Sequence, residues 1–170
     1  AEVIIPRLPE EAVAQEHPFL FISAAEIEAL NKQAETDAGL KIMIDNDIII
    51  PGKMAVINAA KGITLPAKGK NSAHAELARQ ARRAALGYAF SGDESMAKTA
   101  KEYLLAYARS YKSYPLEIAY DGRVTTQTLN ESPWLIDLAW TYDLIWNSGV
   151  LSAAEREEIE KNLLWEAVRV

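Results

Sequence analysis

The chain has 170 residues, no cysteine and a formal net charge of −6. Without cysteine it has no disulfide, no thiolate metal site and no cysteine nucleophile. The acidic balance argues against a nucleic-acid binder, which needs clustered positive charge, and no run of about 18 apolar residues is present to span a membrane. Hydrophobic residues make up 49% of the chain, which is enough for one globular domain or part of one.

The first 22 residues contain three prolines and show no helical periodicity. This pattern predicts an extended arm that lies on the surface of the protein. A helix is expected to start at Ser23, because Ser23 and Glu26 have the spacing of a capping box. Gly39 is a typical residue to end it. We therefore divide the chain into an arm over residues 1–22 and a helical domain over residues 23–170.

Residues 40–70 leave more than one interpretation open. The segment IMIDNDIIIPGKMAVINAAKGITLP is compatible with a helix, a short strand pair or both. Within it, IIIPGK is typical of a turn between two apolar runs. Residues 66–72 are rich in Lys, Gly and Asn and predict a linker.

The rest of the chain shows helical periodicity. One apolar stripe starts near Ser72, and a second follows Asp93, a residue that can cap a helix. A loop over residues 115–126 precedes a helix over residues 128–146, and Ser152 with Glu155 forms another capping box before the last helix. The stripe of the 128–146 helix is wide and aromatic, and it consists of Trp134, Leu135, Leu138, Tyr142 and Ile145.

These patterns predict an all-α fold of antiparallel helical hairpins in series. There are no heptads long enough for a coiled coil and no repeat of fixed period. Ala-rich helix faces favour close antiparallel packing. Two architectures fit: a helical bundle, or part of an incomplete (α/α) toroid built from stacked hairpins.

Residues near the 128–146 helix are the candidate contacts for a glycan. An arginine can pair with a carboxylate through two hydrogen bonds, and a tryptophan can stack on a sugar ring. The alternative interpretation is structural: capping and a first-turn carboxylate at the helix start, a solvated loop arginine, core aromatics and a buried tyrosine bonded to a carboxylate. The candidate substrate-binding residues are Arg123, Gln127, Asn130, Glu131, Trp134 and Tyr142.

A basic cluster lies farther towards the N-terminus. Arg79, Arg82 and Arg83 can attract an acidic glycan, but we favour their pairing with neighbouring glutamates on the surface, which is worth little stability. No phosphate loop, dinucleotide-binding motif, zinc-protease motif or nucleophile elbow is present. No metal and no cofactor are therefore expected.

Three segments together resemble the N-terminal region of the heparinase II/III-like polysaccharide lyases, especially the oligoalginate lyases. They are HPFLFISAAEIEALNKQ at residues 17–33, ALGYAFSGDESMAKTAKEYLLAYA at residues 85–108, and TLNESPWLIDLAWTYDLI at residues 128–145 with LSAAEREEIEKNL after it. The resemblance implies an α/α toroid followed by a β-sandwich-like domain. It also implies cleavage of an acidic polysaccharide, such as alginate, by β-elimination.

That reaction needs a group that neutralises the uronate carboxylate, a base for the C5 proton and an acid for the leaving oxygen. In the resembled family these roles fall to an Asn or similar group, Tyr and His in later helices. Neither His17 nor His74 lies in such a place. We therefore expect no catalytic residue in this chain, which would be the inactive first part of a lyase.

The resemblance implies three partners: an acidic glycan, the remainder of the toroid and a C-terminal β-domain. Exposed helix faces would also allow a homo-oligomer. A start at Ala1 rather than Met favours a periplasmic or secreted protein.

Two other classes of function stay open. One is a non-catalytic helical module that binds a glycan or a protein. The other is a toroid glycoside hydrolase, which requires two carboxylates facing one cavity. The spacing of the available carboxylates selects no pair among Glu117, Asp121, Glu131, Asp137 and Asp143.

Overall fold

The computed structural model describes residues 16–116 and 121–169, and this part of the chain contains helices and no strand. The predicted all-α class is confirmed, whereas the toroid stays a prediction. Most of the predicted arm, residues 1–15, lies outside the described residues. The α-helices are α1 Ala24–Ala34, α2 Ala38–Ile44, α3 Ile50–Ala59, α4 Asn71–Ser91, α5 Glu94–Ser110, α6 Thr128–Ile145, α7 Ala153–Ile159 and α8 Trp165–Val168.

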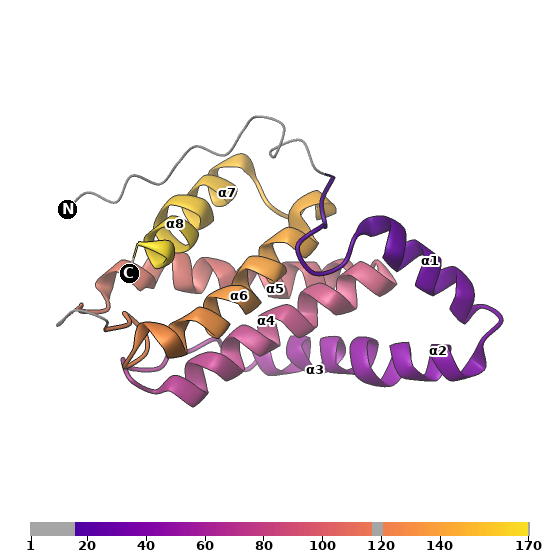
Figure 1. Cartoon of the computed structure of the whole chain (residues 1–170), viewed down its shortest axis with the longest axis horizontal. Helices are drawn as coiled ribbons and strands as arrows, with labels where there is room; N and C mark the ends of the chain where they lie inside the picture. The colour runs from indigo at the N-terminus through magenta and orange to yellow at the C-terminus, as the bar shows by residue number, and fades with distance from the viewer. Residues whose placement is uncertain (1–15, 117–120, 170) are drawn as a thin grey trace.

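Several helices begin and end at the residues that the sequence indicated. Ser23 caps α1 and Ser152 caps α7, and both predicted capping boxes are confirmed. Asp93 caps α5 by accepting a hydrogen bond of 3.0 Å from the backbone N–H of Ser95. Gly92, with φ +72°, ends α4 in the left-handed conformation. The tight connection that results makes α4 and α5 an antiparallel hairpin (Figure 1).

The prediction that Gly39 ends the first helix is wrong. α1 ends at Ala34, and Asp37 then accepts a hydrogen bond of 3.0 Å from the backbone N–H of Leu40. This carboxylate caps α2, because it satisfies a backbone donor that has no partner within the helix. Gly39 therefore lies in the first turn of the next helix.

The predicted turn at IIIPGK is also wrong. α2, a π-helical turn over Asp45–Ile49 and α3 form one continuous helix over residues 38–59. At the end of the π turn the N–H of Ile50 bonds to the carbonyl of Asp45, five residues back. Pro51 follows directly, in the first turn of α3. A proline lacks the N–H of the usual α-helical bond, and the first turn of a helix segment is where that loss is tolerated.

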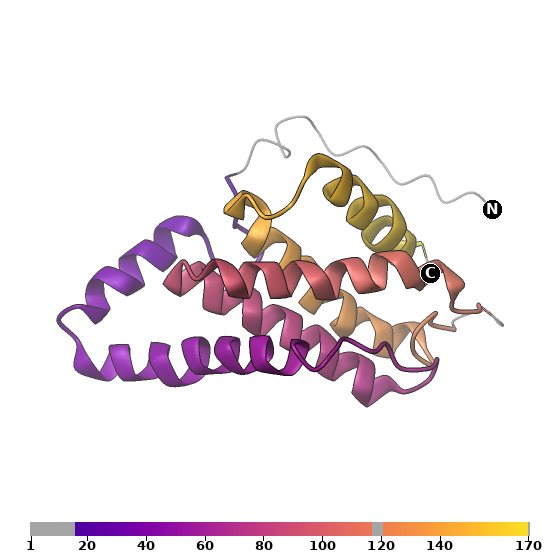
Figure 2. The same cartoon turned by 180° about the vertical axis from the view of Figure 1, so that it is seen from behind.

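α4 lies at the centre of the bundle. It packs against α3, α5 and α6, and Figure 2 shows α5 and the 38–59 helix on the side opposite to that of Figure 1. Small side chains make up much of its buried face, which lets neighbouring backbones approach closely. These buried small residues are Ala78, Ala81, Ala84, Ala85 and Gly87.

The predicted aromatic stripe of α6 faces this core. Trp134, Leu138 and Ile145 are almost fully buried, Tyr142 is buried and Leu135 is half-buried. α7 and α8 lie beside α5 and α6, away from the 38–59 helix (Figure 1). The aromatic helix is therefore covered by the bundle along its apolar face.

α3 and α4 come into close contact at two glycines, Gly52 and Gly87. A Cβ atom added at Gly52 would lie 3.0 Å from the Cα of Gly87, 3.1 Å from the carbonyl oxygen of Arg83 and 2.9 Å from the Sδ of Met96. Two of these atoms belong to the backbone, so they can yield only if the helices separate.

We predict that Gly52→Ala lowers the free energy of unfolding by about 1–3 kcal/mol, the usual cost of overpacking. The loss is expected although alanine is the better helix former. Gly39→Ala is the matched control, because Gly39 is exposed and an added Cβ would meet only the Asp37 side chain, at 3.3 Å. Urea unfolding measures both variants, and equal stability of the two would contradict the close contact.

The second capping box gives a pH-dependent prediction. Hydrogen bonds from Ser152 and an ion pair of 3.0 Å with Lys101 lower the pKa of Glu155 from 4.5 to about 2. Because the folded pKa lies below the unfolded value, this carboxylate stabilises the fold fully above pH 4.5. The contribution is lost as the pH falls towards 2.

Glu155→Gln is therefore expected to be less stable than the natural chain at neutral pH and to approach it in stability as the pH falls to about 2. Urea unfolding midpoints across this range test the difference. A difference that stays constant with pH would show that the ionised carboxylate is not responsible.

Candidate functional site

The structure separates the six predicted substrate-binding residues into three places. Arg123, Glu131 and Trp134 gather around the ring of Tyr111, where α5, α6 and the loop before α6 meet. The other three residues lie apart from this cluster.

Glu131 joins the loop to α5. Its buried carboxylate accepts hydrogen bonds from the hydroxyl of Tyr111 at 2.5 Å and from the backbone N–H groups of Val124 at 3.1 Å and Thr125 at 3.2 Å. Burial and the hydrogen bond to Glu131 raise the pKa of Tyr111, which keeps its hydroxyl protonated as a donor. Glu131 therefore holds the loop in place, a role beyond the helix-dipole interaction that the sequence suggested.

Trp134 and Arg123 complete this cluster. The indole of Trp134 stacks on Tyr111 with ring centroids 5.6 Å apart and an interplanar angle of 14°. The guanidinium carbon of Arg123 lies 5.8 Å from the centre of the same ring, and its Nη1 donates to the carbonyl of Tyr114 at 3.1 Å. Trp134 is 1% exposed, so it packs the core in this structure.

The start of α6 leaves two of the six residues accessible. The helix begins at Thr128, so Gln127 takes the cap position, and its side chain makes no capping hydrogen bond. Gln127 and Asn130 are both exposed. Their predicted contact with a glycan stays a prediction.

Tyr142 lies farther along α6. Its hydroxyl donates to the carboxylate of Glu160 at 2.6 Å, and burial together with this hydrogen bond raises its pKa. A tyrosine bonded to a carboxylate was the structural alternative for this position, although the partner is Glu160 and not the adjacent Asp143.

The basic cluster of α4 is paired. Glu76 lies 2.9 Å from Arg79 and 3.1 Å from Arg83, and Asp137 lies 2.7 Å from Arg82. The favoured interpretation, pairing with acidic neighbours, is therefore confirmed for Arg79 and Arg83, while Arg82 reaches across to α6.

His74 is a buried structural residue. Its Nδ1 lies 2.9 Å from the hydroxyl of Tyr107, and its Nε2 lies 3.3 Å from the carbonyl oxygen of Ala67. Burial lowers its pKa, so the neutral imidazole is favoured. These contacts tie the linker before α4 to α5.

Asp143 has a role that the sequence did not reveal. Its carboxylate is 2% exposed and lies 2.5 Å from the Nδ1 of His17. It also accepts hydrogen bonds from the backbone N–H groups of Phe19 at 2.8 Å and Leu20 at 2.9 Å. One buried carboxylate near the end of α6 therefore satisfies three donors of a segment that has no helical bonds of its own.

Aromatic contacts reinforce this attachment. The His17 ring stacks on Trp146 with centroids 4.7 Å apart, and the ring of Phe21 lies 4.6 Å from that of Trp140. The side-chain amide of Asn147 donates to the carbonyl of His17 at 2.9 Å. Residues 17–21 are thus fixed across the C-terminal half of α6.

Beside this attachment lies an open pocket of about 720 Å³, which we call the arm pocket. It lies between residues 17–18, α1 and the C-terminal ends of α4 and α6. The lining residues are His17, Pro18, Ala24, Ile27, Glu28, Asn31, Lys32, Glu35, Tyr88, Ala89, Gly92, Leu144, Asn147 and Ser148.

One wall of the arm pocket carries charged groups of both signs. Glu28, Lys32 and Glu35 line it from α1, and none of them forms an ion pair within the part of the chain that the structure describes. Their charges are therefore available to a ligand.

Neutral polar groups complete the lining. The amide nitrogens of Asn31 and Asn147 donate to backbone carbonyls, which leaves each amide oxygen as an acceptor. Burial raises the pKa of Tyr88, so its hydroxyl stays protonated. Together with apolar Ile27 and Leu144, these groups suit a ligand that has hydroxyl groups and a partly apolar ring.

The described residues contain neither a candidate metal site nor a membrane-spanning helix. No group of three or more His, Asp or Glu side chains there could hold a metal ion. No helix in residues 16–116 or 121–169 is long and apolar enough to cross a membrane.

Comparison with known proteins gives a partial relationship. No protein-family model matches the chain. The chain is 38% identical over 86 residues to an exo-oligoalginate lyase of Saccharophagus degradans. The aligned part covers 48% of this chain and only 11% of that relative. This similarity supports a relation to the polysaccharide lyases, and the narrower heparinase II/III-like assignment stays a prediction.

We predict that Asp143→Ala lowers the free energy of unfolding by about 2–4 kcal/mol, because it leaves three donors without their charged acceptor. The freed segment should also be cut faster by chymotrypsin at Phe19 and Phe21. Asp45→Ala is the control, since Asp45 forms an exposed pair with Lys41 on one helix, worth at most about 0.5 kcal/mol. If Asp143→Ala and the control were cut at the same rate, Asp143 would not hold the segment.

Proposed function

We propose that this chain is the N-terminal helical part of a polysaccharide lyase that cleaves a uronate-containing glycan, such as alginate, by β-elimination. The similarity to an exo-oligoalginate lyase over about half of the chain carries this proposal. The arm pocket supports it, because Lys32 offers a cation for a uronate carboxylate and the neutral polar groups suit sugar hydroxyls.

In this proposal the arm pocket binds sugar units of the glycan. Its volume of about 720 Å³ lies within the range of about 300–1,000 Å³ that is usual for ligand pockets. Lys32 pairs with a uronate carboxylate, and Glu28 and the amide oxygen of Asn31 accept hydrogen bonds from sugar hydroxyls. Tyr88 donates its hydroxyl from α4.

The reaction requires a base for the C5 proton, an acid for the leaving oxygen and a group that neutralises the uronate carboxylate. The described residues supply binding and positioning in our proposal, and the acid and base come from sequence beyond these 170 residues. We propose that the hairpins continue into an α/α toroid with a β-domain. A periplasmic or extracellular location is part of the same proposal.

The six candidate residues named from the sequence have two different roles in our proposal. Gln127 and Asn130, exposed at the start of α6, are proposed to contact the glycan away from the arm pocket. α6 has 18 residues, so its two ends lie about 27 Å apart. The other four members of the set support these surfaces from within: Glu131, Trp134 and Tyr142 are buried, and Arg123 is half-buried.

A lyase assay tests the proposal. The complete gene product and the 170-residue chain are each given alginate oligomers, heparan sulfate and hyaluronan, and the ultraviolet absorbance of the unsaturated uronate product is followed. We expect activity on alginate oligomers from the complete product and none from the chain alone. No absorbance from either protein would overturn the proposal. Release of reducing ends without absorbance would instead indicate a hydrolase, and binding without cleavage a binding module.

The pocket itself is tested by Lys32→Ala in the complete gene product. Loss of one charge-assisted contact, worth about 1.5–3 kcal/mol, should raise the KM for alginate oligomers at least tenfold. The value of kcat should change little, because the contact is made in the ground state and the transition state alike. Lys98→Ala, an exposed lysine of α5, is the control and should leave KM unchanged. A KM that Lys32→Ala and Lys98→Ala change equally would remove Lys32 from the site.

A further inference from the structure

His17 lines the arm pocket, and several contacts fix its imidazole ring. Its Nδ1 lies 2.5 Å from the carboxylate of Asp143. The ring stacks on Trp146 with centroids 4.7 Å apart, and its centroid lies 5.0 Å from that of Phe19. The side-chain amide of Asn147 donates to the backbone carbonyl of His17 at 2.9 Å. The ring of His17 is therefore held in one orientation, although the segment around it has no helical bonds of its own.

The contact with Asp143 determines which nitrogen of His17 carries a proton. One oxygen of Asp143 accepts from the backbone N–H groups of Phe19 and Leu20, and the other faces the Nδ1 of His17. An ionised carboxylate is only an acceptor, so the Nδ1 is the donor in this contact. In a neutral imidazole the second nitrogen, Nε2, is then an acceptor with a free lone pair.

The Nε2 of His17 is accessible. No described residue forms a hydrogen bond with it, and the side chain is 24% exposed. Among the described residues, the buried side-chain nitrogens without a partner belong to Arg123, Trp134 and Arg156, and not to His17. Because His17 lines the arm pocket, its Nε2 is the nitrogen that is free to meet a ligand there.

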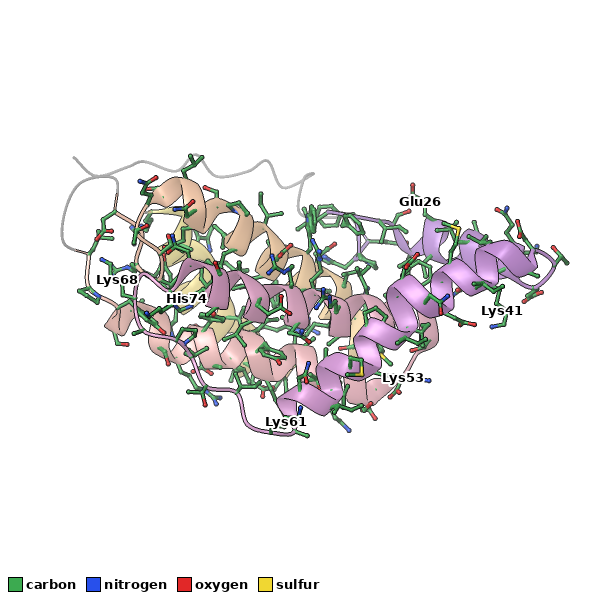
Figure 3. All side chains as sticks on the ribbon, turned by 90° about the horizontal axis from the view of Figure 1, so that it is seen from below. Glu26, Lys41, Lys53, Lys61, Lys68 and His74 are labelled. Atoms are coloured by element: carbon green, nitrogen blue, oxygen red, sulfur yellow. The ribbon has the colours of Figure 1, made fainter. Side chains whose placement is uncertain are left out.

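The other histidine of the sequence has no free nitrogen. His74 lies near the start of α4, at the opposite end of that helix from the arm pocket (Figure 3). Its two nitrogens face the hydroxyl of Tyr107 and the carbonyl of Ala67, and the side chain is fully buried. His74 therefore serves as a control within the same molecule.

The groups that line the arm pocket are divided between its walls. His17 and Asn147 present acceptors, the Nε2 of the one and the amide oxygen of the other. The cation of the pocket, Lys32, lines it from α1 instead. A sugar hydroxyl can donate to an acceptor, whereas an ionised carboxylate has no proton to donate. The hydroxyl groups of a uronate therefore suit the His17 wall, and its carboxylate suits Lys32.

We propose that His17 is a ligand-binding residue of the arm pocket, whose Nε2 accepts a hydrogen bond from a sugar hydroxyl, and that Asp143 is the positioning residue that sets this tautomer. The inference rests on the sugar-binding role of the arm pocket proposed above, and it adds the orientation of the bound sugar. Asp143 then has two roles, because the side chain that attaches residues 17–21 also prepares one wall of the pocket for its ligand.

Nuclear magnetic resonance of the complete gene product, labelled with nitrogen isotope at histidine, tests the tautomer. At about pH 8 an ordinary imidazole is neutral, so the Nδ1 of His17 should be protonated and its Nε2 unprotonated. Signals that are absent from His17→Asn identify this residue. A trimer of mannuronate should shift the Nε2 signal of His17 and leave both nitrogens of His74 in place. A proton on Nε2 in the free protein, or an Nε2 signal that the trimer does not shift, would overturn the proposal.

Asp143→Asn tests the positioning role. The amide oxygen of the new side chain can accept from the backbone N–H groups of Phe19 and Leu20, while its NH2 group donates to the Nδ1 of His17. The proton of His17 should therefore move to Nε2. A nuclear Overhauser effect between the rings of His17 and Trp146 verifies that the segment stays attached. A proton that remains on Nδ1 in the attached segment would show that Asp143 does not set the tautomer.

His17→Asn tests the ligand contact. Its amide nitrogen can still donate to Asp143, but the Nε2 is lost. The Kd for the mannuronate trimer, measured by calorimetry on the complete gene product, should rise about fivefold, the usual effect of losing one hydrogen bond. Lys98→Ala, at the exposed lysine of α5, is the control and should leave the Kd unchanged.

An unchanged Kd in His17→Asn would contradict the inference. Lyase activity is a separate readout. If the complete gene product cleaves alginate oligomers while His17→Asn binds the trimer as the natural protein does, this inference alone fails. If no cleavage occurs but the trimer still shifts the Nε2 signal of His17, the proposed reaction fails and the ligand contact stands.

Discussion

The buried carboxylate of Asp143 is the interaction on which the arm pocket depends. It receives the His17 ring and two backbone N–H groups from residues 19 and 20. A charged group with 2% exposure is stable only when donors surround it, so the segment before α1 must lie across α6. That position places residues 17–18 and α1 beside the ends of α4 and α6, and together they line the pocket. The arm pocket is thus formed by distant parts of the chain and depends on the side chain of Asp143.

The second constraint on the fold is the row of small side chains on the buried face of α4. Its alanines and Gly87 let α3 and α6 pack close to one central helix. With Gly52 against Gly87, α3 lies close along α4. The opposite face of the 38–59 helix carries exposed apolar side chains, which are Ile42, Met43, Ile50, Met54 and Ile57.

Local signals in the sequence predicted much of the fold. The capping boxes at Ser23 and Ser152 and the stripe of α6 depend on residues three or four positions apart, and the structure confirms them. The π turn before Pro51 was missed, because a bond to the fifth preceding residue leaves no periodic signal of its own. The role of Asp143 was also missed, since its donors lie more than 120 residues away and two are backbone groups. Glu131 was chosen as a polar residue at a helix start, and its partners in the loop could be seen only in three dimensions.

Binding of a uronate oligomer in the arm pocket is the central claim of this account. It is tested most directly by nuclear magnetic resonance spectra of the isotope-labelled protein titrated with a trimer of mannuronate, beside a neutral trimer of glucose. The account predicts that the amide signals of Asn31, Lys32, Tyr88 and Asn147 shift with the uronate and much less with the neutral sugar, while those of Ile50 and Met54 stay in place. Shifts confined to the start of α6, or equal shifts with both sugars, would contradict it.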